Sequence, residues 1–319
     1  MTGQPFEIVK IRARRPVPGL RPQHLAAVRA ATMISRARVG GAFEGSPDLR
    51  FEPGPIASGD YRFEITTAGA ASLVLQTVLP PLATSGGPSR VEVTGGTHVN
   101  ASPSFEFLSR NWGGTVAGMG MDVGFHLLRA GFYPPGGGEV HARVATWASR
   151  PAGLMLEERG ALLDVRGVSG AGKVRSDVAR RQADAVHERL WEARRIESSF
   201  EVVEAPAASP GSFLYVEAIF ERTRAGFGFL GERGLRAEVL GGRVARTLLQ
   251  FLEGDGAVDP HLADQLAVPL ALGGAGGRVT TPRVTQHLVT VAEIVSLFGI
   301  PANTWGRVGG PGGLEVAAH

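Results

Sequence analysis

Strand-like and helix-like segments follow one another along almost the whole chain. Alternating apolar and polar side chains predict strands at residues 6–14, 60–66 and 89–96, and helical spacing predicts helices at 23–35, 68–82 and 104–119. Residues 124–144 predict a hairpin of two strands. This mixture predicts an α/β or α+β architecture and excludes an all-α or all-β fold.

The middle of the chain differs in composition from both flanks. Between about residues 157 and 236, a strand-like run, a charged helix at 175–194, a Pro/Ala/Ser loop and the strand FLYVEAIFE form a separate β-α-β pattern. Helical spacing resumes at about 236–252 and 261–272. We therefore expect a small α/β domain at 157–236, inserted into a repeat-built domain of residues 1–156 and 237–319.

The composition limits the class of protein. The 319 residues are 43% hydrophobic, which is enough for sizeable cores, and they include no cysteine, which excludes disulfides and thiolate metal sites. The basic N-terminus lacks the apolar core of a signal peptide, and Gly, Pro or charged residues interrupt every later apolar run. We expect a soluble, cytoplasmic protein with no membrane partner.

Arginine supplies nearly all of the positive charge. The net charge is only +3, and Lys10 and Lys173 are the only lysines. Genomic base composition would explain this bias, but the arginine fork also binds phosphate in bidentate fashion. A phosphate-rich partner and a solvated face are both consistent with the densest early cluster, which is Arg12, Arg14, Arg15 and Arg21.

His287 lies just before a predicted helix. Thr290 and Glu293 have the spacing of a capping box, and Gly299 marks the end of the helix after about Phe298. His287 would then lie in a connection, where it could either hydrogen-bond to backbone or act as a nucleophile or general base.

Two glycine-rich stretches suggest phosphate binding. Residues 167–174 (GVSGAGKV) fit G-x-x-x-x-G-K, but Val174 replaces the hydroxyl that a P-loop places on magnesium, so we expect a glycine-rich turn between strand and helix. Residues 131–140 (GFYPPGGGEV) could expose amides to an anion, although a tight hairpin is the simpler expectation.

Polar pairs occur on otherwise apolar helices. Asp264 and Gln265 in HLADQLAVPLAL could be surface positions, or they could hydrogen-bond a ribose or a base. Gln23 and His24 stand at a helix start, where capping and anion binding are both plausible. Spacing alone assigns neither pair a role.

Taken together in chain order, these segments resemble the RNA 3'-terminal phosphate cyclase family. The resemblance covers nearly the whole chain and is carried by TGQPF (2–6), residues 11–31, 59–82 and 87–97, GFYPPGGGEV, HLADQLAVPLALGGAG and TQHLVT. It implies an α/β (α+β) fold of repeated units, each with a four-stranded sheet and two helices, interrupted by a small α/β insert.

The resemblance also implies an ATP-dependent reaction with a divalent metal, Mg²⁺ or Mn²⁺, whose ligands it leaves unassigned. His287 would attack the α-phosphate of ATP, and the adenylyl group would move to an RNA 3'-phosphate. The adjacent 2'-hydroxyl would then expel AMP and leave a 2',3'-cyclic phosphate. Arg12 and Arg15 match arginines that hold phosphates, and Arg21, Gln23 and His24 would bind RNA or phosphate. The implied nucleotide contacts are Gln76, Pro103, Phe107, His261, Asp264 and Gln265.

One part of the family pattern is not matched by the sequence. Family members have a strand, a glycine-rich loop and a helix before T-G-Q-P-F, and with them a glutamate expected to bind metal. This sequence begins directly on that segment. A start assigned too late fits best because the rest of the catalytic pattern, His287 included, is intact; a shortened chain and a lost activity are the alternatives.

Other functions stay open beside the cyclase. A catalytically impaired RNA-binding relative is disfavoured by His287, and a P-loop phosphotransferase is disfavoured by Val174. An enolpyruvyl-transferase-like enzyme would need a site for a small phosphorylated acid and no histidine adduct.

Overall fold

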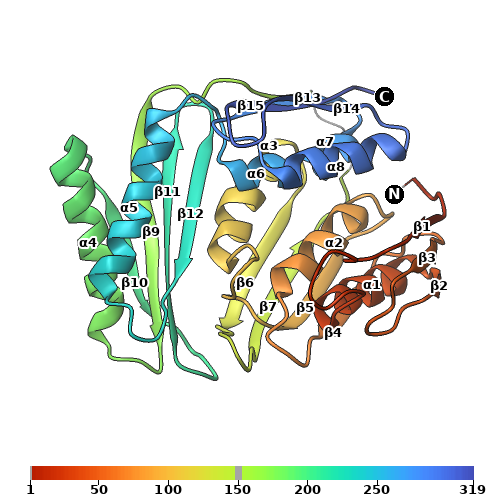
Figure 1. The fold of residues 1–319 in the computed structure, drawn as a ribbon, viewed down its shortest axis with the longest axis horizontal. Coiled ribbons are helices and arrows are strands. Elements are labelled where there is room, and N and C mark those ends of the chain that lie inside the picture. Colours follow the sequence, from red (N-terminus) through yellow and green to blue (C-terminus); the bar gives the residue numbers. More distant parts are fainter. Residues whose placement is uncertain (1, 148–152) are drawn as a thin grey trace. The chain divides into compact units, whose positions relative to one another are not determined.

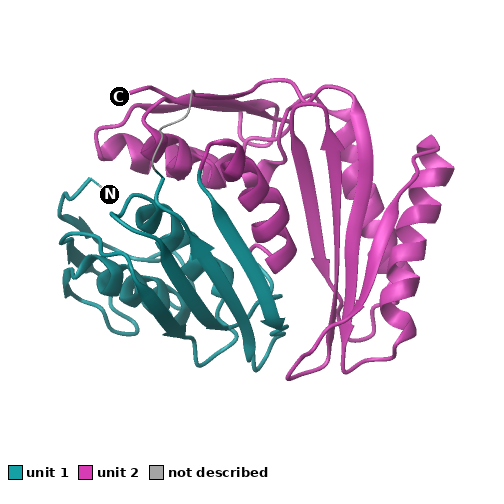
Figure 2. Cartoon of the chain, turned by 180° about the vertical axis from the view of Figure 1, so that it is seen from behind, with its two compact units in different colours: residues 1–102, 121–148 teal, residues 103–120, 149–319 magenta. Residues whose placement is uncertain are grey.

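The computed structural model describes residues 2–147 and 153–319, and these form two compact units. One unit comprises residues 1–102 and 121–148, and the other comprises residues 103–120 and 149–319 (Figure 2). The chain therefore leaves the first unit after residue 102 and returns to it at residue 121 before it continues into the second unit.

Two sheets and two helices form the first unit (Figure 1), with strand orders β1-β3-β2 and β4-β5-β7-β6. The predicted helix at 23–35, the strands at 60–66 and 89–96 and the hairpin at 124–144 are confirmed. The elements are β1 (Phe6–Ile8), α1 (Pro22–Ser35), β2 (Arg38–Gly40), β3 (Leu49–Glu52), β4 (Asp60–Glu64), α2 (Ala71–Ala83), β5 (Ser89–Gly95), β6 (Val123–Arg129) and β7 (Gly138–Val144).

Helix α2 is almost completely buried. Its side chains Val74, Leu75, Val78 and Leu79 have no exposed surface, as a helix in a core requires. It begins three residues later than the apolar spacing indicates, because Ala70 is still extended and forms a parallel bridge with Gly96, the residue after β5.

Strand β1 is much shorter than the sequence indicates. It ends at Ile8, and the chain then turns, because Lys10 and Arg12 have φ angles of 56° and 54°. The Arg15 amide donates to the Arg12 carbonyl at 2.9 Å within this turn. The predicted strand at 6–14 is therefore wrong after residue 8, and Arg12, Arg14 and Arg15 lie in a loop.

A continuous helical segment, residues 105–118, opens the second unit. Its centre is a π-helix, η1 (Phe107–Trp112), and α3 (Gly113–Gly118) completes it. The predicted helix at 104–119 is confirmed, but apolar spacing gave no sign of the wider π-helical turns, which are frequent at functional sites.

Two four-stranded sheets complete the second unit, with strand orders β10-β9-β11-β12 and β14-β15-β13-β8. The elements are β8 (Leu154–Leu156), β9 (Leu162–Gly172), α4 (Asp177–Arg194), β10 (Ser199–Glu204), β11 (Gly211–Phe220), β12 (Arg224–Leu230), α5 (Ala237–Glu253), α6 (Pro260–Gln265), α7 (Ala267–Gly273), β13 (Gly277–Thr281), α8 (Gln286–Leu297), β14 (Ala302–Gly306) and β15 (Gly312–Val316).

Two of the sheets share one topology, which confirms the predicted repeated units. In β4-β5-β7-β6 the first pair is parallel and the other pairs are antiparallel, and β8-β13-β15-β14 has the same order and the same directions. The sheet β1-β3-β2 corresponds to the last three strands of this order, because both of its strand pairs are antiparallel. The segment from β9 to α5 lies between β8 and α6 in this last unit, and we call it the insert; that it is a separate domain with the predicted bounds 157–236 stays a prediction.

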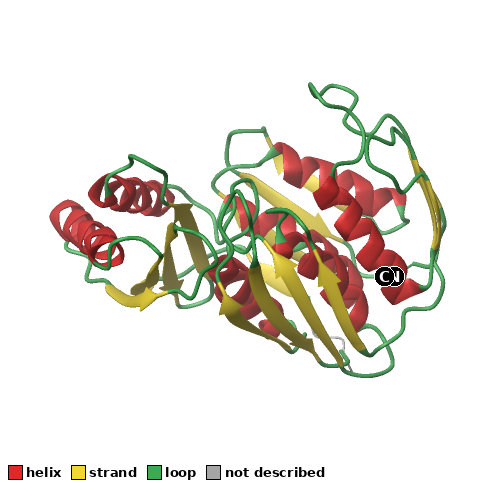
Figure 3. Ribbon diagram, turned by 90° about the horizontal axis from the view of Figure 1, so that it is seen from below, coloured by secondary structure: helices red, strands yellow, loops and turns green. Residues whose placement is uncertain are grey.

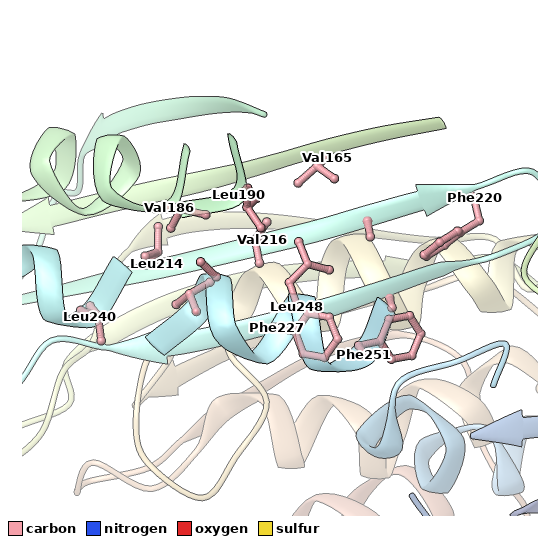
Figure 4. Close-up of a cluster of buried hydrophobic side chains, with 14 residues drawn as sticks. Val165, Val186, Leu190, Leu214, Val216, Phe220, Phe227, Leu240, Leu248 and Phe251 are labelled. Carbon is pink, nitrogen blue, oxygen red and sulfur yellow. The ribbon is translucent and has the colours of Figure 1, made fainter. Parts of the chain in front are cut away.

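Helices α4 and α5 pack on one face of the insert sheet (Figure 3). Their shared core joins Val186 and Leu190 of α4, Leu240 and Leu248 of α5, and Val216 of β11, each at most 2% exposed (Figure 4). Helix α5 thus packs on this sheet beside α4, although the predicted inserted domain ends at residue 236. Amphipathic spacing shows that a helix has a buried face but not which sheet covers it.

The glycine-rich residues 167–172 belong to a strand. They form the second half of β9, which pairs with both β10 and β11. A Cβ atom at Gly170 would overlap the ring of Phe213 on β11, so glycine permits close packing here. The expected turn and the P-loop alternative are both wrong, because a phosphate-binding loop needs free amides between a strand and a helix.

Candidate active site

His287 is exposed in the first turn of α8. The N-cap of this helix is Thr285, whose hydroxyl accepts from the Leu288 amide at 3.0 Å. The helix ends at Leu297, and Gly299 has a φ of 85°, which is the left-handed conformation predicted for the glycine that ends this helix. The imidazole therefore stands at a helix N-terminus, where the partial positive charge of the backbone favours an approaching phosphate.

The predicted capping box of Thr290 and Glu293 is wrong, and so is the placement of His287 before the helix. Thr290 lies inside α8, where its hydroxyl donates to the Gln286 carbonyl at 2.9 Å. A bridge between Val284 and Val308 holds the preceding chain extended, so the helix begins directly after this bridge. A tertiary contact therefore decides which threonine caps the helix.

Asp264 of α6 is joined to the start of α8 through Thr285. The Thr285 hydroxyl donates to Asp264 Oδ2 at 3.5 Å, the long limit of a hydrogen bond. Burial and then the negative charge of Asp259 raise the pKa of Asp264 to about 7, while the bond from Thr285 opposes this increase. Asp264 can therefore change charge near neutral pH when a ligand binds beside it.

Asp259 fixes the start of α6. Its side chain has no exposed surface, and its Oδ1 accepts from the amides of His261 and Leu262 at 3.0 and 2.9 Å. Its Oδ2 accepts from Asn111 Nδ2 at 2.7 Å and from the Gly226 amide at 3.4 Å. Burial raises the pKa of Asp259 even though these donors favour its charged form. Sequence reasoning missed this residue, although an aspartate before a helix-starting proline is an N-cap signal.

The π-helix η1 holds α6 through two contacts. Asn111 donates to Asp259, and Trp112 Nε1 donates to the Gln265 carbonyl at 3.3 Å. Asn111 and Asp259 are 148 residues apart in the chain, so no local signal could have found this pair. The apolar residues expected in the nucleotide pocket belong to the same segment: Phe107, which is buried, and Pro103, which is half-buried.

His24 is held in one tautomer at the start of α1. Its Nδ1 accepts from the Arg21 amide at 3.0 Å, which leaves Nε2 as the N–H donor while the ring is neutral. Burial lowers the pKa of His24, and the positive charges of Arg12 and Arg21 lower it further. Capping, one of the two roles left open for His24, is therefore present, and a neutral imidazole N–H beside two arginines can still donate to a phosphate.

The arginines near His24 differ in their partners and in their exposure to solvent. Arg12 is half-buried, and its Nη1 donates to the Val17 carbonyl at 2.8 Å. Arg21 Nη1 lies 3.1 Å from the Glu44 carboxylate. Arg15 is exposed. The loop therefore holds Arg12 by a hydrogen bond to its own backbone, whereas Arg15 extends from an exposed position.

The predicted site residues form two groups, one in each unit. The first unit holds Arg12, Arg15, Arg21, Gln23, His24 and Gln76, and the second holds Pro103, Phe107, His261, Asp264, Gln265 and His287. Within the first unit, α1 with Gln23 packs against α2 with Gln76. Within the second unit, α6 with Asp264 packs against α8 with His287.

Residues 2–147 and 153–319 contain no group of three or more His, Asp or Glu side chains placed to hold a metal ion. In the same part of the chain, no helix has both the length and the apolar character needed to cross a bilayer.

A family model described as RNA 3'-terminal phosphate cyclase matches residues 1–301. The chain belongs to the RNA 3'-terminal phosphate cyclase family. Among relatives of that name, the protein from Ralstonia nicotianae is 46% identical over 298 residues, which cover 93% of this chain and 84% of the relative. The protein from Pseudomonas fluorescens is 42% identical over 319 residues, covering 100% and 92%. That from Ectopseudomonas mendocina is 40% identical over 299 residues, covering 93% and 86%.

Proposed function

We propose that this chain converts an RNA 3'-terminal phosphate into a 2',3'-cyclic phosphate through a covalent adenylate on His287. Membership of the family makes the chain an RNA 3'-terminal phosphate cyclase, a ligase-class enzyme of RNA processing that uses ATP. The exposed imidazole at the N-terminus of α8, next to the helix of Asp264, is the observation that best supports the residue assignment. We place the enzyme in the cytoplasm.

In the first step, a neutral His287 nitrogen attacks the α-phosphorus of ATP. A nitrogen–phosphorus bond forms, and pyrophosphate leaves with the electron pair of the broken phosphoanhydride bond. The backbone amides at the start of α8 would stabilise the charge that develops on the phosphoryl oxygens.

In the second step, an oxygen of the RNA 3'-phosphate attacks the adenylyl phosphorus and breaks the bond to His287. The RNA 2'-hydroxyl oxygen then attacks the activated 3'-phosphorus, loses its proton and expels AMP. AMP is needed because a phosphate monoester has no good leaving group of its own. Arg12, Arg15 and the Nε2–H of His24 are the groups we assign to the RNA phosphate.

The nucleotide contacts are proposed for the helix α6 and for the chain around η1. The imidazole of His261 is exposed, and Asp264 can accept a hydrogen bond from a ribose hydroxyl in its charged form. Gln265 and Gln76 are proposed as further polar contacts, and Pro103 and Phe107 as the apolar side.

A divalent metal is proposed as a companion of ATP. Magnesium is usually held by substrate phosphates, waters and one or two carboxylates, so a cage of protein ligands is not expected. The described residues do not form such a cage by themselves, and every step above is therefore assigned to side chains, backbone or substrate.

Intact-mass spectrometry after incubation with ATP and magnesium tests the nucleophile. We expect one adenylyl increment on the unaltered chain and none on His287→Ala. His126→Ala is the matched control, because His126 is another exposed histidine, on β6, and it should keep the increment. An increment that persists on His287→Ala would refute the assignment.

The same experiment separates the cyclase from a catalytically impaired RNA-binding relative. Absence of the increment from every version, with binding of 3'-phosphorylated RNA retained, would favour the RNA-binding relative. A P-loop phosphotransferase is already excluded by the strand β9, since the residues of its expected loop are paired in a sheet.

A further inference from the structure

A groove lies between the two helices of the insert, on the side of α4 and α5 that faces away from their shared core. Ion pairs show that the helices run parallel: Arg181 and Glu238 are 2.7 Å apart at the N-terminal ends, and Arg194 and Glu253 are 3.4 Å apart at the C-terminal ends. The helices approach closely, because a Cβ atom at Gly241 would lie 2.6 Å from a carbonyl oxygen of α4. The groove has a volume of about 720 Å³.

Arginine dominates the charge of this groove. Four arginines and two glutamates line it, so that positive charge is in excess: Arg189, Arg236, Arg243, Arg246, Glu192 and Glu238. Both glutamates already have arginine partners, since Glu192 lies 3.4 Å from Arg189 and Glu238 lies 2.7 Å from Arg181.

The remaining three arginines have no carboxylate within ion-pair distance among residues 2–147 and 153–319. Arg236, Arg243 and Arg246 are all exposed. They occur at the N-cap of α5 and seven and ten residues later, which places them along one face of the helix. At a rise of about 1.5 Å per residue they are about 10 and 5 Å apart along the helix axis, and such a row of guanidinium groups suits a ligand whose negative charges repeat along a chain.

The other lining residues favour a nucleic acid over a protein partner. Protein interfaces depend on aromatic or large apolar anchors in desolvated pockets, but the apolar contribution to this groove is only Ala193, Val239 and Leu249. Contacts to phosphates need no such anchor, because the arginine fork and counterion release supply the affinity.

We propose that this arginine groove binds the phosphodiester backbone of the RNA whose 3' end reacts at His287. The proposal rests on the proposed function for the identity of the RNA. It gives the insert a role in the affinity for long substrates and none in the chemical step. It requires no base-specific contact, since the arginines meet phosphates alone.

The double variant Arg243→Gln, Arg246→Gln tests the groove. Loss of two phosphate contacts should weaken binding of a 3'-phosphorylated RNA of about 20 nucleotides roughly tenfold at 0.15 M salt, and should reduce the slope of log affinity against log salt by about 1.4. Fluorescence anisotropy of the labelled RNA measures both. Arg90→Gln, Arg180→Gln is the matched control, since these arginines are also exposed, lie outside the groove and carry the same charge.

Two further measurements decide between the proposals. Cyclisation of a 3'-phosphorylated dinucleotide, which is too short to reach along the groove, should be the same in the double variant and the control. If this reaction proceeds while the double variant binds long RNA as the control does, the groove proposal is refuted and the proposed function stands. If no version forms the histidine adenylate while the double variant still loses RNA affinity, the groove stands and the proposed function fails.

A polyglutamate chain of about 20 residues serves as the competitor that represents an acidic protein partner. Polyglutamate should displace the labelled RNA poorly, because the groove is assigned to a phosphodiester backbone and not to a chain of carboxylates. Displacement as effective as that by unlabelled RNA would overturn the assignment of the groove to RNA.

Discussion

Replacing Asp264 with asparagine should stabilise the protein above neutral pH. Burial, assisted by the charge of Asp259, raises the pKa of Asp264 from an ordinary value of 3.8 to about 7. Between these two values the folded protein binds a proton that the unfolded chain has lost, so the stability contributed by Asp264 falls as pH rises from about 4 to about 7. Above this window the folded protein holds a half-buried negative charge, whereas asparagine stays neutral.

The magnitude follows from the difference between the two pKa values. A difference of about 3 units corresponds to about 4 kcal/mol at full effect, because each unit is worth about 1.4 kcal/mol. Water reaches the partly exposed carboxyl, so we expect Asp264→Asn to raise the free energy of unfolding by about 2 kcal/mol at pH 8. At pH 5 the increase should be less than half as large, because the folded carboxyl is then protonated.

Urea denaturation at pH 5 and pH 8 measures this difference. Asp184→Asn, on the exposed face of α4, is the control and should change stability little at either pH. An equal effect of Asp264→Asn at both pH values, or a loss of stability at pH 8, would refute the reasoning. The same variant should form less histidine adenylate. This result would show that Asp264 lowers the stability of the fold but contributes to nucleotide binding.

Substitutions at two further positions test the contacts that shape the second unit. Asp259→Ala removes the N-cap of α6 and leaves the Asn111 amide unpaired, so urea denaturation should show that the free energy of unfolding falls by about 3 kcal/mol. Asp259→Asn should lower it by about half as much. Gly170→Ala would force a methyl group against the Phe213 ring, so the melting temperature should fall by an amount that corresponds to about 2 kcal/mol of unfolding free energy. An unchanged melting temperature would show that β9 and β11 can separate at this point.

The local elements were largely predictable because each is encoded by its own apolar pattern. Helix α1, strands β4 and β5 and the hairpin of β6 and β7 lie within a few residues of their expected positions. The start of α8 was not predictable in this way. Two threonines compete to cap it, and only the bridge of Val284 with Val308 selects Thr285.

The candidate site was identified from the sequence through motifs, and its supporting contacts were not. His287, Asp264 and His24 occur in short segments whose residue types and order are specific. Asn111 and Asp259 hold α6 in place, but they are 148 residues apart and their pairing leaves no pattern in either segment. Long-range pairs of buried polar groups become visible only when the chain is folded.

The sequence by itself determined the class of fold, the order of most elements and the family, because periodicity and motif order are properties of contiguous residues. Only the tertiary structure decided that residues 167–172 are strand, that α5 packs with the insert and that burial raises the pKa of Asp264. These properties depend on which surfaces meet and how much water they exclude. Such information is distributed over distant segments, and no local stretch of the chain contains it.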